Sequence, residues 1–453
     1  MIRFLRKLAN DRRGNMLVIA GAALPLLVGA AGLATDTIQW TLWKRELQRA
    51  ADSGAIAGVY TRVTNDTQTD VEGAVNLDLA KYSGVSLDDD ATDIELLGDD
   101  GEKTHQVRVT LAVSKKLPFS SLFMATPPTI HAVSTAATVP GADEFCVLAT
   151  DPTASKTGIE ITGSTYLDLG SCSLMANSKH PSQAASNGNT GGGGGAGSGS
   201  TVKAKSLAAA GGVKYSNTWE VDDYDPNSPT IIDPFGPDGV QPLPNPSSSD
   251  CTKNVTTDMT KNQSYPMDRT VGTGKDVAGS TVCFNQGGGL KVQGTLKLQD
   301  GVTYIINGGD LTMSNASSSL SCNHCTIIMT NFANPANTGN VKITGGTLSI
   351  TAPVDDGLTY KGVAFYQDRR ATDSGATGQN QINGNNGASI TGAVYFANRS
   401  LLYNGGSQTV AACMQIVSRR VSFSGNSNFA LTSECPLSGM TPVGGGQRVR
   451  LVA

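Results

Sequence analysis

Cysteine is the residue type in this 453-residue chain whose placement most clearly allows chemistry. An even number of cysteines confined to one part of a chain predicts disulfides and an oxidising compartment. The simplest pairing joins neighbours along the chain: Cys146 with Cys172, Cys251 with Cys283, and Cys413 with Cys435. Buried free thiols in a cytosolic protein are the alternative. The eight residues all lie beyond position 145: Cys146, Cys172, Cys251, Cys283, Cys322, Cys325, Cys413 and Cys435.

Cys322-Asn323-His324-Cys325 is the sharpest local motif. Two thiols at this spacing suit a tight disulfide, a redox dithiol or half of a zinc site. Tetrahedral zinc needs four ligands, and the sequence contains no second pair of this kind. A thioredoxin-like dithiol opens a helix after a strand, whereas Thr326–Met329 has the residue types of a strand. A structural disulfide is therefore the favoured interpretation.

The sequence contains no G-x-S-x-G, H-E-x-x-H or P-loop motif. The charged clusters are Asp88–Asp90, Asp355-Asp356 and Asp368-Arg369-Arg370. The first lacks EF-hand spacing, and adjacent residues of a strand point to opposite faces. We expect turn or surface roles for these residues. We also expect no enzyme activity, no cofactor and no bound metal.

Residues 1–60 predict a membrane anchor. Met16–Thr35 carries no charged residue and is long enough to cross about 30 Å of hydrocarbon as a helix. Basic residues precede this run and Asp36 follows it, which predicts a cytoplasmic N-terminus and an exported, periplasmic remainder. A cleaved signal peptide is the alternative, although its apolar region is normally about 7–15 residues long. The basic residues are Arg3, Arg6, Lys7, Arg12 and Arg13.

Helical periodicity continues beyond the apolar run. Trp40 and Trp43 lie where an interfacial aromatic belt is expected. A ridge of small residues follows, which allows close approach of another helix. We favour packing against the protein's own amphipathic helix at Asp70–Tyr82 over dimerisation within the membrane. The ridge comprises Leu47, Ala50, Ala51, Gly54, Ala57 and Gly58.

This N-terminal part resembles the TadE/TadG-like family of Flp (Tad) pilus-assembly proteins. The resemblance covers roughly residues 10–60 and rests on Arg12–Asn15, Ala23–Pro25, Gly32–Asp36 and Leu47–Gly58. It implies an inner-membrane, pseudopilin-like or accessory protein of a tight-adherence pilus system. Prepilin-like members have a glutamate five residues after the glycine that precedes their cleavage site. Here Ile19 occupies the position five residues after Gly14, so the chain is more similar to the unprocessed, TadG-like type.

Residues 61–140 predict a small α+β segment. The helix at Asp70–Tyr82 is followed by three runs in which apolar and polar residues alternate, as they do in half-buried strands. These runs are Asp93–Leu97, Gln106–Val113 and Thr129–Val139.

Residues 141–453 predict a glycine-rich, mainly-β domain. Pairs of short β-forming runs flank a glycine in Leu290–Leu298, Val302–Met313 and Val341–Ile350, and glycine accepts the positive φ that a sharp corner requires. This pattern favours a parallel β-helix-like solenoid, with a β-sandwich as the alternative. Gly/Ser-rich and then Pro-rich composition at about 182–250 predicts a flexible excursion, or a linker between two subdomains.

The fold class predicted from the sequence is an N-terminal transmembrane helix, a small α+β segment and a mainly-β domain. The predicted function is a membrane-anchored structural or accessory component of Tad (Flp) pilus assembly. Its exported β domain would bind other pilus-assembly or envelope proteins, and membrane lipid is a second expected partner. A net charge of −4 gives no reason to expect nucleic acid. An adhesin or glycan-binding envelope protein is the alternative, and a β-helix carbohydrate-active enzyme is less favoured.

Overall fold

The computed structural model divides into two compact units, Met1–Pro140 with Arg448–Ala453 (unit 1) and Gly141–Gln447 (unit 2). The residues that the structure describes are 15–82, 92–141, 144–187, 200–214, 218–255, 264–265, 269–271, 279–285, 288–354, 357–375, 379–384, 389–405, 413–425, 428–430, 440 and 447–452.

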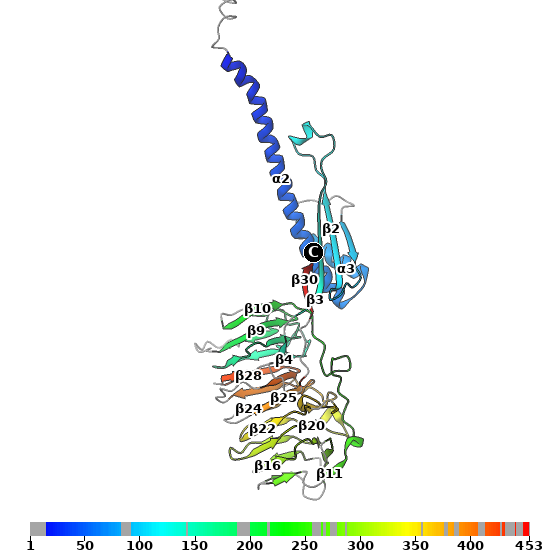
Figure 1. Cartoon of the computed structure of the whole chain (residues 1–453), viewed down its shortest axis with the longest axis vertical. Coiled ribbons are helices and arrows are strands. Elements are labelled where there is room, and N and C mark those ends of the chain that lie inside the picture. The colour runs from blue at the N-terminus through cyan, green and yellow to red at the C-terminus, as the bar shows by residue number, and fades with distance from the viewer. Residues whose placement is uncertain are drawn as a thin grey trace, which may run out of the picture. The chain divides into compact units, whose positions relative to one another are not determined.

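The described residues of unit 1 combine two α-helices with a four-stranded sheet (Figure 1). The long helix α2 (Asn15–Thr64) is followed by α3 (Gln68–Leu79). The sheet has the order β1-β2-β3-β30, and β2 pairs antiparallel with both β1 and β3. Its strands are β1 (Thr92–Leu96), β2 (Thr104–Val113), β3 (Ile130–Pro140) and β30 (Gln447–Val452). We expected one β domain to run to the C-terminus, but β30 instead joins the sheet of unit 1.

The core of unit 1 forms where the second half of α2 and α3 cover one face of the sheet. Alternation along β2 buries Val107, Val109 and Leu111 against the helices. The ridge of small residues faces α3, as its spacing predicts. A Cβ added at Gly54 would lie 3.3 Å from Val75 Cγ1, and one added at Gly58 would lie 2.8 Å from Val107 Cγ1. These two glycines therefore set how closely α2 approaches its neighbours.

Unit 2 is built from parallel strands, and every pairing among its described strands is parallel (Figure 1). The strands are β4 (Phe145–Ala149), β5 (Ile159–Ile161), β6 (Tyr166–Asp168), β7 (Ser173–Ala176), β8 (Ala185–Asn187), β9 (Thr201–Ala209), β10 (Trp219–Pro226), β11 (Lys253–Val255), β12 (Ser264–Tyr265), β13 (Arg269–Val271), β14 (Thr281–Phe284), β15 (Leu290–Val292), β16 (Thr295–Leu298), β17 (Thr303–Asn307), β18 (Leu311–Met313), β19 (Ser319–Cys322), β20 (Thr326–Thr330), β21 (Val341–Ile343), β22 (Thr347–Thr351), β23 (Val363–Gln367), β24 (Asn380–Gly384), β25 (Ser389–Phe396), β26 (Leu401–Gly405), β27 (Met414–Ser418), β28 (Val421–Ser424) and β29 (Asn428–Ala430).

Through β22 most strands pair with the strand three positions later in the chain, as β14 does with β17 and β17 with β20. Three ladders result. The one we call ladder 1 runs β11-β14-β17-β20-β23-β25-β27-β4-β7-β9-β10. A second ladder runs from β12 to β8, and a third includes β13, β16, β19, β22 and β25.

Ladder 1 is buried on both faces. One face is a column of paired residues that enters the main core: Val282, Tyr304, Ile327, Phe365, Val394, Ile416, Val147, Leu174 and Leu207. The column on the opposite face enters a second core: Cys283, Ile305, Ile328, Tyr366, Tyr395, Val417, Leu148, Met175 and Ala208. Two buried faces explain why β20 and β23 are buried at every residue and carry consecutive apolar side chains rather than an alternating pattern.

Glycine corners join short strands as the sequence predicts. Gly309, between β17 and β18, has φ of 74°, and an added Cβ would lie 2.2 Å from the backbone nitrogen of Gly289. Gly346, between β21 and β22, has φ of 83°. A side chain at Gly309 would therefore be excluded both by its own backbone conformation and by the neighbouring corner.

The order of strands in ladder 1 differs from their order in the chain. β27, near the end of unit 2, pairs with β4, at its start, while β10 and β11 occupy opposite ends of the ladder. Residues 227–250, which we call the Pro strap, carry the chain from β10 towards β11. Figure 1 shows this green segment running along one side of the stacked strands.

The segment at about 182–250 differs from the flexible excursion that its composition predicts. β8, β9 and β10 lie within it and pair with their neighbours, and the Pro strap packs against ladder 1. Residues 188–199, most of the Gly/Ser tract, lie outside the described residues. Composition predicted a flexible segment, but contacts with residues far away in the sequence hold the strap in place, and local composition carries no information about such contacts.

We expect Gly58→Leu to destabilise unit 1 by about 1–3 kcal/mol, because the new side chain overpacks the contact with Val107 and Val75. The measurement is hydrogen exchange of the β2 amides in the full-length protein. Gly73→Ala in α3 is the control, since no atom lies within 4 Å of its added Cβ. Alanine there should stabilise the helix by about 0.5–1 kcal/mol. Unchanged β2 protection in the Gly58 variant would contradict the packing.

Candidate functional site

The two halves of α2 have different surroundings. The helix continues through Pro25, and its first half exposes large apolar side chains, among them Leu26 at 76% and Leu27 at 69%. Its second half supplies Leu47, Ala51 and Ala55 to the core of unit 1. By length and composition, α2 is the one helix among the described residues that is long and apolar enough to cross a membrane. Exposed side chains of this kind need an apolar partner that the rest of unit 1 does not provide.

Trp43 and Trp40 lie between these halves. Trp43 was expected in an interfacial aromatic belt. It is partly buried and packs against the unit 1 core, so it also contributes to the packing of unit 1. Trp40 is partly buried, and its indole nitrogen has no hydrogen-bond partner within the described structure.

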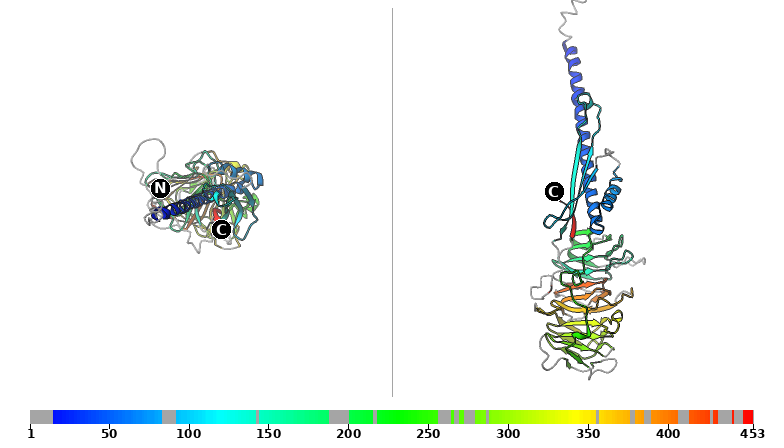
Figure 2. Two further views of the ribbon diagram at one scale, coloured as in Figure 1. Left: turned by 90° about the horizontal axis from the view of Figure 1, so that it is seen from above. Right: turned by 90° about the vertical axis from the view of Figure 1, so that its right-hand side faces the viewer.

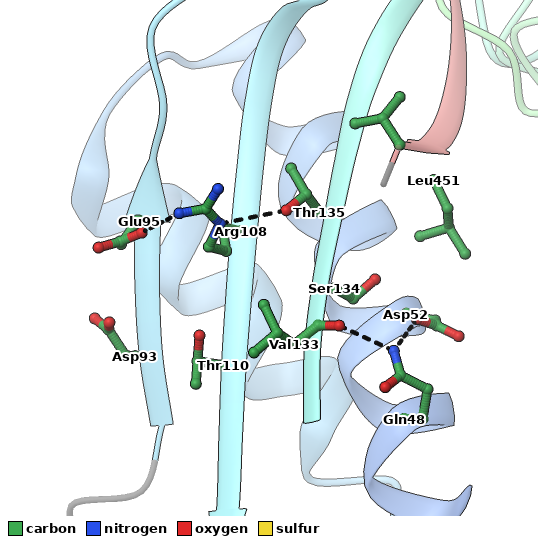
Figure 3. Close-up of a pocket in the computed structure, with 11 residues that line it drawn as sticks. Gln48, Asp52, Asp93, Glu95, Arg108, Thr110, Val133, Ser134, Thr135 and Leu451 are labelled. Atoms are coloured by element: carbon green, nitrogen blue, oxygen red, sulfur yellow. Dashed lines mark hydrogen bonds and ion pairs between the residues drawn. The ribbon is translucent and has the colours of Figure 1, made fainter. Parts of the chain in front are cut away.

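An open groove of about 750 Å³ lies across the sheet of unit 1 (Figure 3). Arg108 bridges the strands, with its Nη1 3.3 Å from Glu95 Oε2 and its Nε 3.4 Å from Thr135 Oγ1. Gln48 donates to Asp52 Oδ1 and to the carbonyl oxygen of Val133. The groove mixes carboxylates with exposed apolar side chains, which suits binding of a peptide segment better than acid–base catalysis. Asp93, Thr110, Ser134, Leu451 and Val452 complete its lining.

Six of the eight cysteines lie in pairs at disulfide distance. The Cα–Cα separation is 5.6 Å for Cys146 and Cys172, 5.6 Å for Cys251 and Cys283, and 5.9 Å for Cys322 and Cys325. These values fall within the range of disulfides. Cys413 precedes β27, and Cys435 lies outside the described residues, so their pairing stays a prediction.

The positions of the pairs indicate what each would hold together. Cys251 follows the Pro strap, and Cys283 lies on the strap-facing side of ladder 1, so this pair ties the end of the strap to the sheet. Cys322 ends β19 and Cys325 precedes β20, so the C-x-x-C motif spans one corner between two ladders. As its sequence predicts, Thr326–Thr330 is a strand rather than a helix. Among the described residues, no cluster of three or more potential metal ligands exists.

Asp368-Arg369-Arg370 holds the Pro strap. Arg369 Nη2 donates to the carbonyl oxygens of Phe235 and, at 2.8 Å, Leu243, and Arg370 Nη2 donates to that of Pro246 at 2.9 Å. Asp368 is buried and lies 2.7 Å from Arg370 Nη2. A turn or surface role was expected here: Arg369 and Arg370 form a turn, and the adjoining Asp368 is buried. Asp355-Asp356 and Asp88–Asp90 lie outside the described residues.

Aromatic side chains provide the rest of the contact with the strap. The Tyr395 hydroxyl donates to Asp233 Oδ2 at 2.6 Å, and its ring meets Phe235 edge-on at 5.2 Å. Burial raises the pKa of Asp233 despite the hydrogen bond from Tyr395. Burial first, and then the charge of Asp233, raise the pKa of Tyr395. Sequence reasoning missed this cluster, although the uninterrupted apolar run in β23 was a signal that both faces are covered.

A buried ion cluster lies where β27 meets β4. Arg420 Nη1 is 2.6 Å from Asp151 Oδ2 and 3.0 Å from Asp373 Oδ2. Burial alone would raise the pKa of Asp151, but hydrogen bonds from Thr153 and Arg420 outweigh it and lower the pKa. The pKa of Asp373 is lowered in the same way, with Arg420 as its main partner. The cluster therefore holds together strands that are far apart in sequence.

Residues 14–61 match a family model described as putative Flp pilus-assembly TadE/G-like. The match confirms the resemblance seen in the sequence, and it covers most of α2, including the exposed apolar half and the small-residue ridge. No curated protein and no solved structure matches the chain.

We expect Asp151→Asn to lower the free energy of unfolding of unit 2 by roughly 3 kcal/mol at pH 7, because it leaves Arg420 short of a buried partner. A carboxylate with a lowered pKa stabilises the fold above its unfolded pKa near 3.8, and that stability is lost as the pH falls through the folded pKa. The difference from the unmodified protein should therefore shrink below about pH 4. Denaturant unfolding of the detergent-solubilised chain, followed by its β-sheet circular dichroism, measures this.

Asp238→Asn is the matched control, because Asp238 is an exposed carboxylate of the Pro strap. This substitution should leave the denaturant unfolding curve unchanged at both pH 7 and pH 3. A stability difference for Asp151→Asn that stays constant from pH 7 to pH 3 would contradict an ionised Asp151 in the seam, our name for the junction at which β27 pairs with β4.

Proposed function

We propose that this chain is a membrane-anchored structural component of Tad (Flp) pilus assembly. The observation that carries the proposal is the coincidence of the family match with α2. The matched residues include both the apolar segment that needs a lipid environment and the ridge that packs into unit 1. One continuous helix thus links a membrane span to a folded unit, which is what an anchored assembly component requires.

In this proposal the span runs from about Met16 to Thr35, with the N-terminus in the cytoplasm and the rest of the chain in the periplasm. Five basic residues before the span support this direction, because positive charge is retained on the cytoplasmic side. The cysteine pairs support it independently. If they are disulfides, unit 2 folds in an oxidising compartment.

Unit 2 in this proposal is a parallel β-helix-like solenoid. Recurring pairing with the strand three positions later supports it, since three strands would make one turn. Glycine corners and stacked columns of like residues also favour it. A β-sandwich has antiparallel sheets, and the described pairings of unit 2 are parallel.

The role that we propose for unit 2 is binding of another pilus-assembly or envelope protein rather than catalysis. The charged clusters in its described part are engaged in structure: Asp368 and its neighbours hold the strap, and Arg420 holds the seam. The open groove of unit 1 is a second candidate surface for such a partner (Figure 3).

The topology is tested by fusing alkaline phosphatase after Ala453 of the full-length chain. The enzyme folds only where disulfides form, so we expect an active fusion in intact cells. A fusion of the same enzyme before Met1 is the control and should be inactive. An inactive C-terminal fusion at normal expression would refute export.

The cysteine pairing is tested on full-length protein purified without reductant, denatured, and treated with a maleimide. We expect almost no labelling before reduction and labelling of all eight cysteines after it. Cys251→Ser should then release a single thiol, at Cys283, which peptide mapping identifies. Labelling of most cysteines without reduction would argue against an oxidising compartment.

A further inference from the structure

The hairpin formed by β2 and β3 extends along α2 towards its apolar half (Figure 2, right, cyan beside blue). Its connecting loop, residues 114–129, includes a short 3-10 helix at Ser120–Leu122. The Phe119 ring lies directly on the backbone of Gly32. A Cβ added at Gly32 would be 2.1 Å from Phe119 Cδ1, so any larger residue would displace the loop.

The carboxylate of Asp36 binds backbone N–H groups of the same loop. Its Oδ2 accepts the N–H groups of Phe119 at 3.1 Å and Ser120 at 2.5 Å, and the residue is only 4% exposed. Farther along α2, Gln48 donates to the carbonyl oxygen of Val133 at 3.0 Å and Lys44 donates to that of His131. The hairpin is therefore attached to α2 at several points. The charge that ends the apolar run is taken up by the loop rather than by solvent.

The loop presents three consecutive large apolar side chains outward. Leu122 is 75% exposed, Phe123 71% and Met124 42%. Burying a side chain of this size is worth about 1.5–3 kcal/mol, so leaving three together in water is unfavourable. Lys115 and Lys116 are exposed in the same loop.

The attachment point places these side chains at one boundary of the bilayer. Gly32 lies three residues before Thr35, the end of the uncharged run, which is about 4.5 Å along a helix axis. Exposed apolar residues of α2 continue through this level, with Leu33 at 41%, Ile38 at 60% and Leu42 at 51%. Because Phe119 contacts Gly32, the loop adds its exposed apolar side chains near the level at which those of α2 continue.

We propose that Leu122, Phe123 and Met124 insert into the bilayer interface beside α2, as a second membrane contact. The inference rests on the proposed anchoring by α2. Lipid is the occupant we choose because the loop contacts α2 at Gly32, within the proposed span, and because exposed lysines suit the headgroup layer of anionic lipids. The contact would set the rotation of α2 about its axis and thereby the orientation of unit 1, which a single span leaves undetermined.

Photocrosslinking of the full-length chain tests this. The chain, carrying p-benzoyl-phenylalanine at position 123, is reconstituted in vesicles of phosphatidylethanolamine and phosphatidylglycerol, and lipid adducts are detected by mass spectrometry. Position 26, within the span, is the positive control. Leu77, which is 72% exposed on α3, is the negative control. We expect adducts at positions 123 and 26 and none at 77.

An adduct at position 26 without one at 123 would overturn the loop contact and leave the anchor intact. Absence of an adduct at 26 would overturn the anchor and this inference with it. Crosslinking of position 123 to a protein instead of lipid, in native envelopes, would also overturn the proposed contact between the loop and lipid.

The contact between Phe119 and Gly32 is tested by Gly32→Leu, because the leucine side chain would fill the space that the Phe119 ring occupies. The adduct at position 123 should be lost while that at 26 persists. Gly29→Leu is the matched control, since no atom lies within 4 Å of a Cβ added there, and it should preserve both adducts. Equal yields at 123 in the two variants would contradict the role of this contact.

Discussion

The apolar outer face of ladder 1 is the constraint on which unit 2 depends. A parallel ladder with large side chains on both faces must be covered on both, and the Pro strap covers the second. Prolines suit this cover because they bring no N–H group that would need a partner away from water. The strap's carbonyl oxygens still need donors, which Arg369 and Arg370 supply. Gln241 of the strap donates in turn to the carbonyl oxygen of Lys361. The segment with the least regular structure thus completes the core.

The Pro strap also connects the two ends of ladder 1. Because β10 and β11 lie at opposite ends of ladder 1, the chain must cross the ladder's full width before it can return strand by strand to β4. The return ends in a seam between β27 and β4, and there Arg420 joins Asp151 to Asp373. Pairing across the seam joins residues about 270 positions apart, as in the hydrogen bond between Arg420 and Asp151. Such contacts form only after most of the unit has been ordered, which predicts slow folding.

Local features of the fold could be predicted from the sequence, and long-range ones could not. Periodicity located α3, β1, β2 and β3 to within a few residues, and the glycine between paired runs marked corners such as Gly309. The strap was taken for a flexible segment because its packing depends on partners such as Arg369, more than 120 residues away. The roles of Asp36 and of Asp368-Arg369-Arg370 were missed for the same reason. A charged residue's partner is set by topology, and spacing along one strand carries no information about it.

Helix α2 makes the two environments of unit 1 interdependent. Its first half carries exposed apolar side chains, and its second half carries small residues that allow close packing on the sheet. Because the helix is continuous between them, a rotation of the span must turn the sheet as well. The hairpin attached at Gly32 and Asp36 adds a second link, parallel to the first, which resists bending between span and sheet. A force applied to the sheet would therefore reach the apolar half of α2 through two connected elements rather than through one hinge.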